Sequence, residues 1–257
     1  MAGKVFRMIA GRVLVALALL LPVSVMAQRE YSPNFSIGGK AGATLSRMSF
    51  SPEVHQKFTQ GLTMGLACRY TEEKIFGLIG EINVTQRGWA EDFAKDEAPE
   101  FSYSRTLTYV SIPVMTHIYF GSQKFRGFFN LGPEVGFLLG SSIDANFDYD
   151  NYKNIPNFPQ GSRTNEQLAM AVDREFDYGI VGGAGMEIVI KRRHSIMLEG
   201  RYYFGLGNIF KDSKRDFFAA SRNNSIEISL KYMMRVKYAA SGHNIYHTTS
   251  PAHSTVI

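Results

Sequence analysis

The sequence predicts an all-β protein, an eight-stranded antiparallel up-and-down transmembrane β-barrel with long extracellular loops. The first observation is an alternation of side chains that begins at Phe35, where apolar or small residues alternate with polar or small ones through residues 35–46. Similar segments recur until Arg235, and apolar-out, polar-in alternation over about ten residues is typical of a membrane-spanning strand. Because hydrocarbon offers the backbone no hydrogen-bond partners, such strands have to close into a barrel.

The second observation is the spacing of these segments. Eight strands are predicted, at residues 35–46, 61–70, 75–87, 107–120, 125–139, 176–190, 195–206 and 224–236. They are joined alternately by short turns and by long connections, the latter at 47–60, 88–106, 140–175 and 207–223. Outer-membrane barrels have short periplasmic turns and long extracellular loops. A soluble β-sandwich would not need this alternation, and a soluble lipocalin-like barrel would place its apolar parity inside.

The parity of each strand assigns side chains to lipid or to the lumen. In the third segment, Leu78, Ile82 and Val84 are predicted to face lipid, and Glu81 and Arg87 to face inward. Over the eight segments, ten charged residues are predicted to face the lumen: Lys40, Arg69, Arg87, Arg201 and Lys231 against Glu81, Glu134, Glu187, Glu199 and Glu227. Eight strands leave just enough room for side chains to fill the barrel. Since buried charges have to be paired, we expect a packed ion-pair network; a charged lumen that selects a substrate is the alternative.

Residues 1–27 are predicted to be a secretory signal peptide. Basic residues precede an uncharged apolar run at 13–23, and a small-residue site places cleavage between Ala27 and Gln28. The run is shorter than the ~20 residues that a spanning helix needs. The barrel then occupies residues 28–237, and residues 238–257 form a polar C-terminal periplasmic tail. His243 and His247 in that tail have the i, i+4 spacing of helical metal ligands, but nothing caps or supports a helix there.

Charge and cysteine content limit the function classes. The formal charge of +5 includes three basic residues of the signal; the mature chain has 25 Lys and Arg against 23 Asp and Glu, a net +2. This balance gives no reason to expect nucleic-acid binding. Cys68 is the single cysteine, so no disulfide forms within the chain. It lies on the apolar parity of its strand, and we interpret it as a small lipid-facing side chain.

No catalytic, cofactor-binding or metal-binding residues are predicted. The predicted loops hold many acids but a single histidine, His55, and His117 lies on an inward strand face near the periplasmic end. No nucleophile and base are spaced as in a catalytic triad, although a triad is a spatial arrangement. The glycine-rich residues 182–185 lie inside a strand with no helix after them, and therefore do not form a phosphate-binding loop.

The long loop at 140–175 mixes aromatic residues with acids. Phe147, Tyr149, Tyr152 and Phe158 stand among several Asp residues. Tyr-rich loops make adaptable protein contacts, so this loop is interpreted either as a protein-binding surface or as a disordered surface loop.

Two prolines interrupt neighbouring predicted strands. Proline cannot donate to a ladder, and a closed barrel has no free edge to accommodate it. If the intervening turn is centred between Ser122 and Gln123, Pro113 lies opposite residue 132, next to Pro133. We therefore predict a bulge or missing hydrogen bonds near mid-strand; alternatively, both prolines occupy non-donating positions in an intact ladder.

Several motifs together resemble the PorT-type outer-membrane barrels of the Bacteroidetes. They are residues 39–42 (GKAG), 86–89 (QRGW), 109–113 (YVSIP), 117–120 (HIYF), 129–136 (FNLGPEVG) and 182–185 (GGAG). The resemblance covers nearly the whole mature chain. It implies an eight-stranded barrel without enzyme activity, with no catalytic residues to carry over. The founding member is an accessory of the type IX secretion system, which exports proteases and adhesins bearing a C-terminal signal.

The sequence thus favours an outer-membrane barrel, without cofactors, that assists the secretion or assembly of exported proteins. Its expected partners are outer-membrane lipid and other envelope proteins. Two alternatives remain, a structural or adhesive small barrel and a rim enzyme acting on lipid or peptide.

Overall fold

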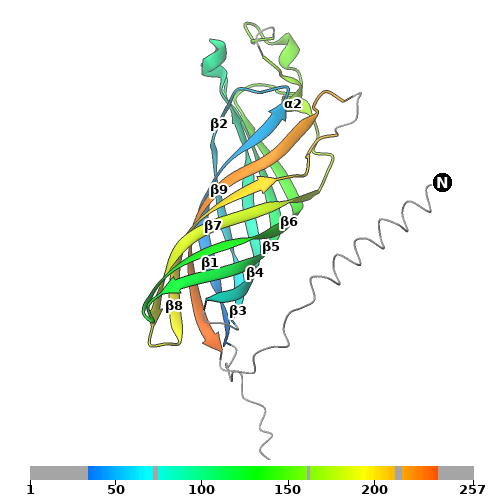
Figure 1. Ribbon diagram of the computed structural model, residues 1–257. Coiled ribbons are helices and arrows are strands. Elements are labelled where there is room, and N and C mark those ends of the chain that lie inside the picture. The colour runs from blue at the N-terminus through cyan, green and yellow to red at the C-terminus, as the bar shows by residue number, and fades with distance from the viewer. Residues whose placement is uncertain (1–33, 72–74, 161–162, 212–215, 237–257) are drawn as a thin grey trace, which may run out of the picture. The chain divides into compact units, whose positions relative to one another are not determined.

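The computed structural model describes residues 34–71, 75–160, 163–211 and 216–236 (Figure 1). The predicted signal peptide with its cleavage site at Ala27 and Gln28, and the predicted tail at 238–257, lie outside the described residues.

The described residues form one closed antiparallel sheet. Its strands are β1 (Asn34–Ser51), β2 (Gln56–Lys57), β3 (Thr59–Thr71), β4 (Phe76–Glu91), β5 (Tyr103–Gly121), β6 (Phe125–Ala145), β7 (Phe176–Ile190), β8 (His194–Gly205) and β9 (Ala220–Val236). The order is β4-β3-β1-β9-β8-β7-β6-β5, and β5 also pairs with β4, which closes the ring. The two-residue β2 is added beside the end of β4. The predicted fold class, an eight-stranded up-and-down barrel, is confirmed.

The strands extend beyond their predicted limits, mainly at the loop end. β5 begins at Tyr103 instead of residue 107, and β6 ends at Ala145 instead of 139. Here the outward positions of β5 are polar, such as Ser104 and Thr106. The ladder therefore continues after the lipid-facing alternation has ended, and sequence periodicity alone does not detect the extension.

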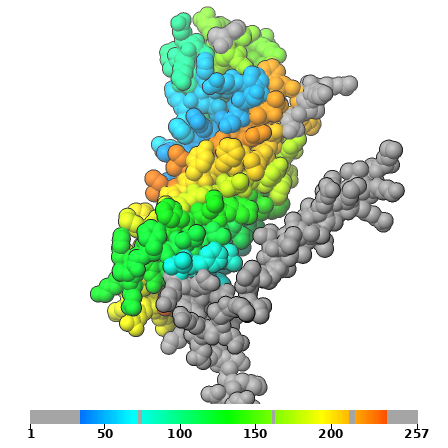
Figure 2. All heavy atoms as spheres, in the orientation of Figure 1, coloured from blue at the N-terminus to red at the C-terminus, as the bar shows by residue number. Residues whose placement is uncertain are grey.

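The wall of the barrel is apolar outside and polar inside. Outward side chains such as Leu66, Ile82 and Ile228 are 71%, 59% and 59% exposed, as expected for a surface that lies in lipid. Their inward neighbours, among them Lys231 and Glu199, are fully buried. Figure 2 shows the strands as oblique bands across the surface of the barrel.

Pro113 and Pro133 do interrupt the wall, but the register differs from the predicted one. Pro113 pairs with Glu134, so the turn between β5 and β6 is centred one residue later than expected. The β4–β5 ladder lacks the pairings of Glu81 and Ile82. The β5–β6 ladder lacks those between residues 114–115 and 132–133.

Each gap follows from the absent N–H of a proline. Without a donor at Pro113, the Glu81 carbonyl receives no ladder bond from β5, and without a donor at Pro133, the Val114 carbonyl receives none from β6. The two gaps therefore flank the same part of β5, on opposite edges. The prediction of missing hydrogen bonds near mid-strand is confirmed, and the alternative of an intact ladder is wrong.

The described loop residues contain three short helices, at the end of the barrel opposite the short turns (Figure 1). They are the 3₁₀ helices η1 (Phe93–Asp96) and η2 (Tyr152–Asn154) and the α-helix α2 (Glu166–Ala169). None of the described helices is long and apolar enough to cross a membrane. With their loops they fold over the end of the barrel. Together with the strand ends they enclose a hydrophobic core, and we call this whole region the cap. Its buried residues include Phe50, Val54, Trp89, Phe93, Tyr103, Tyr152, Phe158, Leu168, Phe210 and Phe218.

Candidate functional site

All ten charged residues that were predicted to face the lumen are inward and buried, none more than 8% exposed. They fall into three groups along the barrel. We call these the middle, upper and lower tiers, the upper one being nearest the cap.

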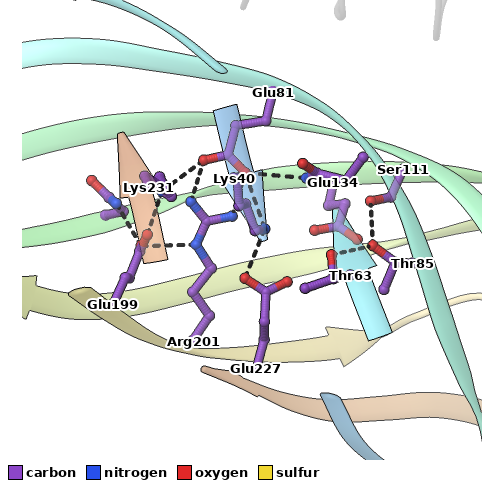
Figure 3. A network of polar contacts seen from close by, with 12 residues as sticks. Lys40, Thr63, Glu81, Thr85, Ser111, Glu134, Glu199, Arg201, Glu227 and Lys231 are labelled. Atoms are coloured by element: carbon purple, nitrogen blue, oxygen red, sulfur yellow. Dashed lines mark hydrogen bonds and ion pairs between the residues drawn. The ribbon is translucent and has the colours of Figure 1, made fainter. Parts of the chain in front are cut away.

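The middle tier centres on the Glu81 carboxylate from β4 (Figure 3). Arg201 Nη1 donates to it at 2.7 Å, Lys231 Nζ lies at 2.7 Å and Lys40 Nζ at 3.2 Å. Three cations from three other strands thus share one carboxylate. The remaining anions complete the group: Glu199 contacts Lys231 and lies 2.8 Å from Arg201, and Glu227 lies 2.7 Å from Lys40. The tier contains three positive and three negative groups.

The upper tier joins Arg87 to Glu134 on β6. The same guanidinium lies 3.9 Å from Asp177 and 3.8 Å from the centre of the Tyr203 ring. Asp177, which the sequence analysis did not include, accepts a hydrogen bond from Asn223 Nδ2 at 2.9 Å. It shares the inward parity of Glu187 on β7, so extending that parity to the first residues of the strand would have identified it.

The lower tier pairs Arg69 with Glu187 at 2.7 Å, and Arg126 approaches the second Glu187 oxygen at 4.0 Å. His117 is fully buried beside them and hydrogen-bonds Asn130 at 2.7 Å. Asn130 Nδ2 in turn donates to Glu199 at 2.6 Å, which links this tier to the middle one. His117 is therefore held within the interior network.

The positive and negative charges balance only when the three tiers are counted together. The upper tier has one excess negative charge, because Asp177 joins Glu134, and the lower tier has one excess positive charge, because Arg126 joins Arg69. With these two additions the network has six cations and six anions. Desolvation of buried ions is costly unless each is paired, and each of the ten predicted charges has an oppositely charged partner within hydrogen-bond distance. Arg126 is the exception to burial, since its side chain is 22% exposed.

The network and its apolar neighbours fill the lumen. Within the middle tier the side chains of Lys40, Glu81 and Lys231 are 0% exposed. A cluster that contains Phe128, Met197 and Met233 is buried toward the short-turn end. Gly183 makes room for this packing, because a Cβ there would lie 2.7 Å from Arg201 Cγ.

A separate polar cluster holds the cap together. Arg163, from the loop between β6 and β7, contacts Glu91 at the end of β4 and donates to Asp96 at 2.9 Å. Asp96 also lies 3.0 Å from His55 Nδ1, so three loops meet at this point. Trp89 Nε1 donates to Glu91 at 2.8 Å. We call these five residues the cap latch. Its members lie far apart in the chain and carry no periodic signal, so the sequence did not predict it.

Burial raises the pKa of Glu91 from its ordinary value near 4.5 to about 7, since desolvation outweighs the Arg163 guanidinium and the hydrogen bonds from Trp89 and Gln167. Glu91 lies beyond the membrane-spanning part of β4. The last apolar lipid-facing residue of that strand is Val84, and the next outward one is Gln86. The cap latch thus contains a carboxyl group that titrates near neutral pH.

The described part of the loop at 140–175 is folded, so the alternative of a disordered loop is wrong there, and its aromatic rings lie in the cap core instead of on the surface. That the loop binds a protein stays a prediction. Tyr152 and Phe158 are each 6% exposed, and Phe147 and Tyr149 pack partly buried against the cap core. Burial of aromatic rings away from water lowers the free energy of the folded protein. The other loops provide the core in which these rings are buried. The loop therefore presents polar residues such as Asp148 and Asp150 outward.

Few of the described residues are arranged for other chemistry. No group of three or more His, Cys, Asp or Glu in the described ranges could hold a metal ion. His55, the loop histidine, lies 3.0 Å from Asp96 Oδ1 through its Nδ1. Cys68 is exposed on the outer wall, as predicted.

Comparison with known proteins agrees with this architecture. A sequence model of the family described as outer membrane protein beta-barrel domain matches residues 26–211. No curated protein matches the sequence. Among solved structures, the outer membrane protein OprG from Pseudomonas aeruginosa is similar with a TM-score of 0.50 at 8% identity, over 81% of this chain and 98% of that one. Neisserial surface protein A (NspA) gives a TM-score of 0.41 at 14% identity, over 79% and 97% of the chains. The attachment invasion locus protein Ail of Yersinia pestis gives 0.38 at 13% identity, over 77% and 98%.

Proposed function

The chain belongs to the outer membrane protein beta-barrel domain family, and from this premise we propose that it is a non-conducting, non-enzymatic barrel that assists the secretion or assembly of exported proteins by contacting other envelope proteins. The observation that carries the proposal is the filled lumen. A barrel whose interior is occupied by paired charges and a closed cap can act only through its outer surfaces. The PorT-type motifs in the sequence favour the type IX secretion system as the process it assists.

A filled lumen makes a direct electrical prediction. Planar-bilayer recordings of the purified barrel are expected to show no steady unitary conductance, because the middle tier is sealed by Lys40, Glu81 and Lys231. Large, steady channel openings would contradict the proposal and favour a charged lumen that selects substrates.

The cap is the part of the protein best suited to contact a partner outside the cell. Its aromatic residues are committed to its own core, and its outward residues, such as Glu97, Glu100 and Asp144, are polar. A folded cap is preorganised, so binding costs less conformational entropy than binding by a disordered loop. Contact with a partner would then use hydrogen bonds and charges, in the manner of a polar interface.

Secretion profiling of a deletion strain tests the role. In the deletion strain we expect exported proteins to accumulate as precursors, and we expect the wild-type gene to restore their export. A matched complementation replaces Asp148 and Asp150 by Ser, which removes outward charge from the cap but leaves Phe147 and Tyr149 in its core and the strands unchanged. Normal export in the deletion strain would overturn the proposal.

The second candidate is a structural or adhesive barrel, and the ordered cap at the outer surface favours it too. In that case the deletion strain would export normally but show fragile or poorly adhering cells. A rim enzyme would instead be revealed by altered lipid A or by peptide cleavage with the purified barrel.

A further inference from the structure

The outer wall carries an apolar groove of about 680 Å³ that crosses β9, β1, β3, β4 and β5. Its lining includes Ile37, Cys68, Gly80, Ile82, Val114 and Met234. The hollow arises because Cys68 and Gly80 are neighbours across β3 and β4, while the taller Leu66 and Ile82 stand in the next row. All these side chains belong to the lipid-facing parity, so the groove opens to the bilayer.

The groove extends obliquely from the periplasmic rim of the barrel toward the centre of the membrane. Its lining follows one row of paired residues, Met234, Ile37, Cys68, Gly80 and Val114. Met234 lies two residues from the end of β9 at Val236, whereas Val114 lies seven residues from the end of β5 at Gly121. At roughly 3.3 Å per residue along a tilted strand, the far end is roughly 10–15 Å deeper.

The dimensions match an acyl chain of one leaflet. Four steps between neighbouring strands give a row roughly 19 Å long. The hydrocarbon core is about 30 Å thick, so each leaflet is about half of that. A groove of this length, inclined and open to lipid, has room for a single extended acyl chain.

The rim end of the groove meets a basic turn. Met234 pairs with His194, whose Nδ1 lies 2.6 Å from the Tyr232 hydroxyl. Immediately before His194, the turn between β7 and β8 exposes Lys191, Arg192 and Arg193 in succession. The neighbouring carboxylate, Glu187, is already paired with Arg69. Arg192 and Arg193 line a small hollow with His194 at this end of the barrel. Three exposed cations directly before His194 in the chain complement a phosphate at the membrane surface.

We infer that this groove is a specific site for one anionic phospholipid of the periplasmic leaflet. One acyl chain lies along Ile37, Cys68, Gly80 and Val114, and the phosphate sits at the basic turn next to His194. The inference does not depend on the proposed role in secretion. It assigns to the barrel wall a bound lipid that distinguishes this face from the rest of the lipid-facing surface.

The test compares two glycine substitutions on the outer wall. Gly80→Leu fills the groove, and the fold has room for it, because the nearest atom to an added Cβ is Cys68 Sγ at 3.6 Å. Gly200→Leu is the matched control, on β8 away from the groove, with nothing within 4 Å of an added Cβ. Both proteins are purified in mild detergent, incubated with equal phosphatidylglycerol and phosphatidylcholine, and analysed by native mass spectrometry.

The wild type and Gly200→Leu are expected to retain one phosphatidylglycerol, and Gly80→Leu to retain at least tenfold less. Arg192→Gln is expected to lower the preference for phosphatidylglycerol over phosphatidylcholine several-fold, whereas Lys124→Gln, in the other described short turn, leaves it unchanged. Equal retention by Gly80→Leu and Gly200→Leu overturns the site. A wild type without headgroup preference, or a second protein copy in place of the lipid, overturns it as well.

Discussion

The lumen and the cap are filled by opposite chemistries, although the same strands build both. Along β4 the inward residues Glu81 and Arg87 belong to the ion-pair tiers, and two positions later Trp89 enters the aromatic core of the cap. The outward face changes in the opposite sense, from Val84 to the polar Gln86. The barrel is polar inside where lipid surrounds it and apolar inside where water does.

The difference shows that the surroundings decide which side chains can stabilise an interior. Within the bilayer, an apolar side chain that moves from the outer wall to the lumen gains nothing from the hydrophobic effect, because the lipid that surrounds the outer wall is already apolar. Charged residues have to leave the lipid-facing wall and are stable only as a paired network. Above the membrane, burial of aromatic rings from water contributes about 25 cal/mol per Å². The lumen is therefore held by electrostatic pairing and the cap by hydrophobic burial.

The largest effect is expected from Glu81→Gln in the middle tier. The change leaves Lys40, Arg201 and Lys231 around a neutral amide and gives the lumen an excess positive charge. Breaking a buried ion-pair cluster in this way costs about 3–5 kcal/mol of global stability. Guanidinium unfolding of the barrel in detergent, followed by its heat-modifiable gel migration, measures the loss.

Glu227→Gln is the control for Glu81→Gln, because among the described cations Glu227 pairs with Lys40 only, and it is 8% exposed. Its cost is expected to be less than half as large. Equal costs would mean that the shared carboxylate has no special role.

A smaller and local effect is expected from Trp89→Ala in the cap. The substitution removes a fully buried ring that packs against Phe50 and Phe210 at centroid distances of 5.4 and 6.3 Å. Truncation of such a residue costs about 3 kcal/mol of stability, and here we expect the cap alone to be destabilised. The loops should become sensitive to protease while the gel shift of the barrel stays unchanged.

The exposed ring of Phe217, in the loop before β9, provides the comparison, because Phe217→Ala removes an aromatic side chain that is 49% exposed. It should leave the loops protected. Joint loss of cap and barrel in Trp89→Ala would show that the two regions are not separately stabilised.

The cap latch predicts a pH effect of at most about 3 kcal/mol, the free energy that corresponds to raising the pKa of Glu91 from 4.5 to about 7. Because the pKa of Glu91 is about 7 in the folded cap and near 4.5 when exposed, the folded cap binds this proton more tightly than the open one. Cap stability is therefore highest below pH 4.5 with respect to this group, and it falls as the pH rises to about 7. Acrylamide quenching of Trp89, the single tryptophan, should increase over this range.

Glu91→Gln is expected to remove the part of the pH dependence between pH 4.5 and 7. The amide can still accept from Trp89 Nε1, so the local hydrogen bond is preserved. Unchanged pH dependence in this variant would assign the effect to another group.

The smallest effect is expected in the barrel wall. Pro113→Val provides an N–H for the Glu81 carbonyl and closes the gap in the β4–β5 ladder. One added hydrogen bond is worth about 1 kcal/mol, seen as a higher unfolding midpoint. Pro99→Val in an exposed loop is the control and should give no gain. If the gaps serve a partner, the double variant Pro113→Val, Pro133→Val will also lower secretion; wild-type secretion would refute that role.

Probing for partners at this seam should use an outward position. Leu131 is 59% exposed on the outer wall, whereas Ser111 is 1% exposed and faces the lumen. A crosslinker at Leu131 can reach envelope proteins, and one at Ser111 serves as the negative control.

The strands, their parity and the end that carries the long loops can be predicted from the sequence alone. These depend on a period of two and on loop length, both of which are local properties of the chain. The ten inward charges, from Lys40 to Lys231, follow from the same parity. So does the position of Cys68 on the outer wall.

Which of these residues contact one another depends on how the strands and loops are arranged in space. Glu81 contacts Arg201, which is 120 residues away in the sequence, because the stagger of the strands brings their two rows to the same height. The cap latch of Glu91 and Arg163, and the inward turn of Tyr152 and Phe158, depend on loops packing against one another. The groove from Met234 to Val114 exists because five strands align one row of side chains across the wall. Such contacts are set by register and closure, which no local pattern in the sequence encodes.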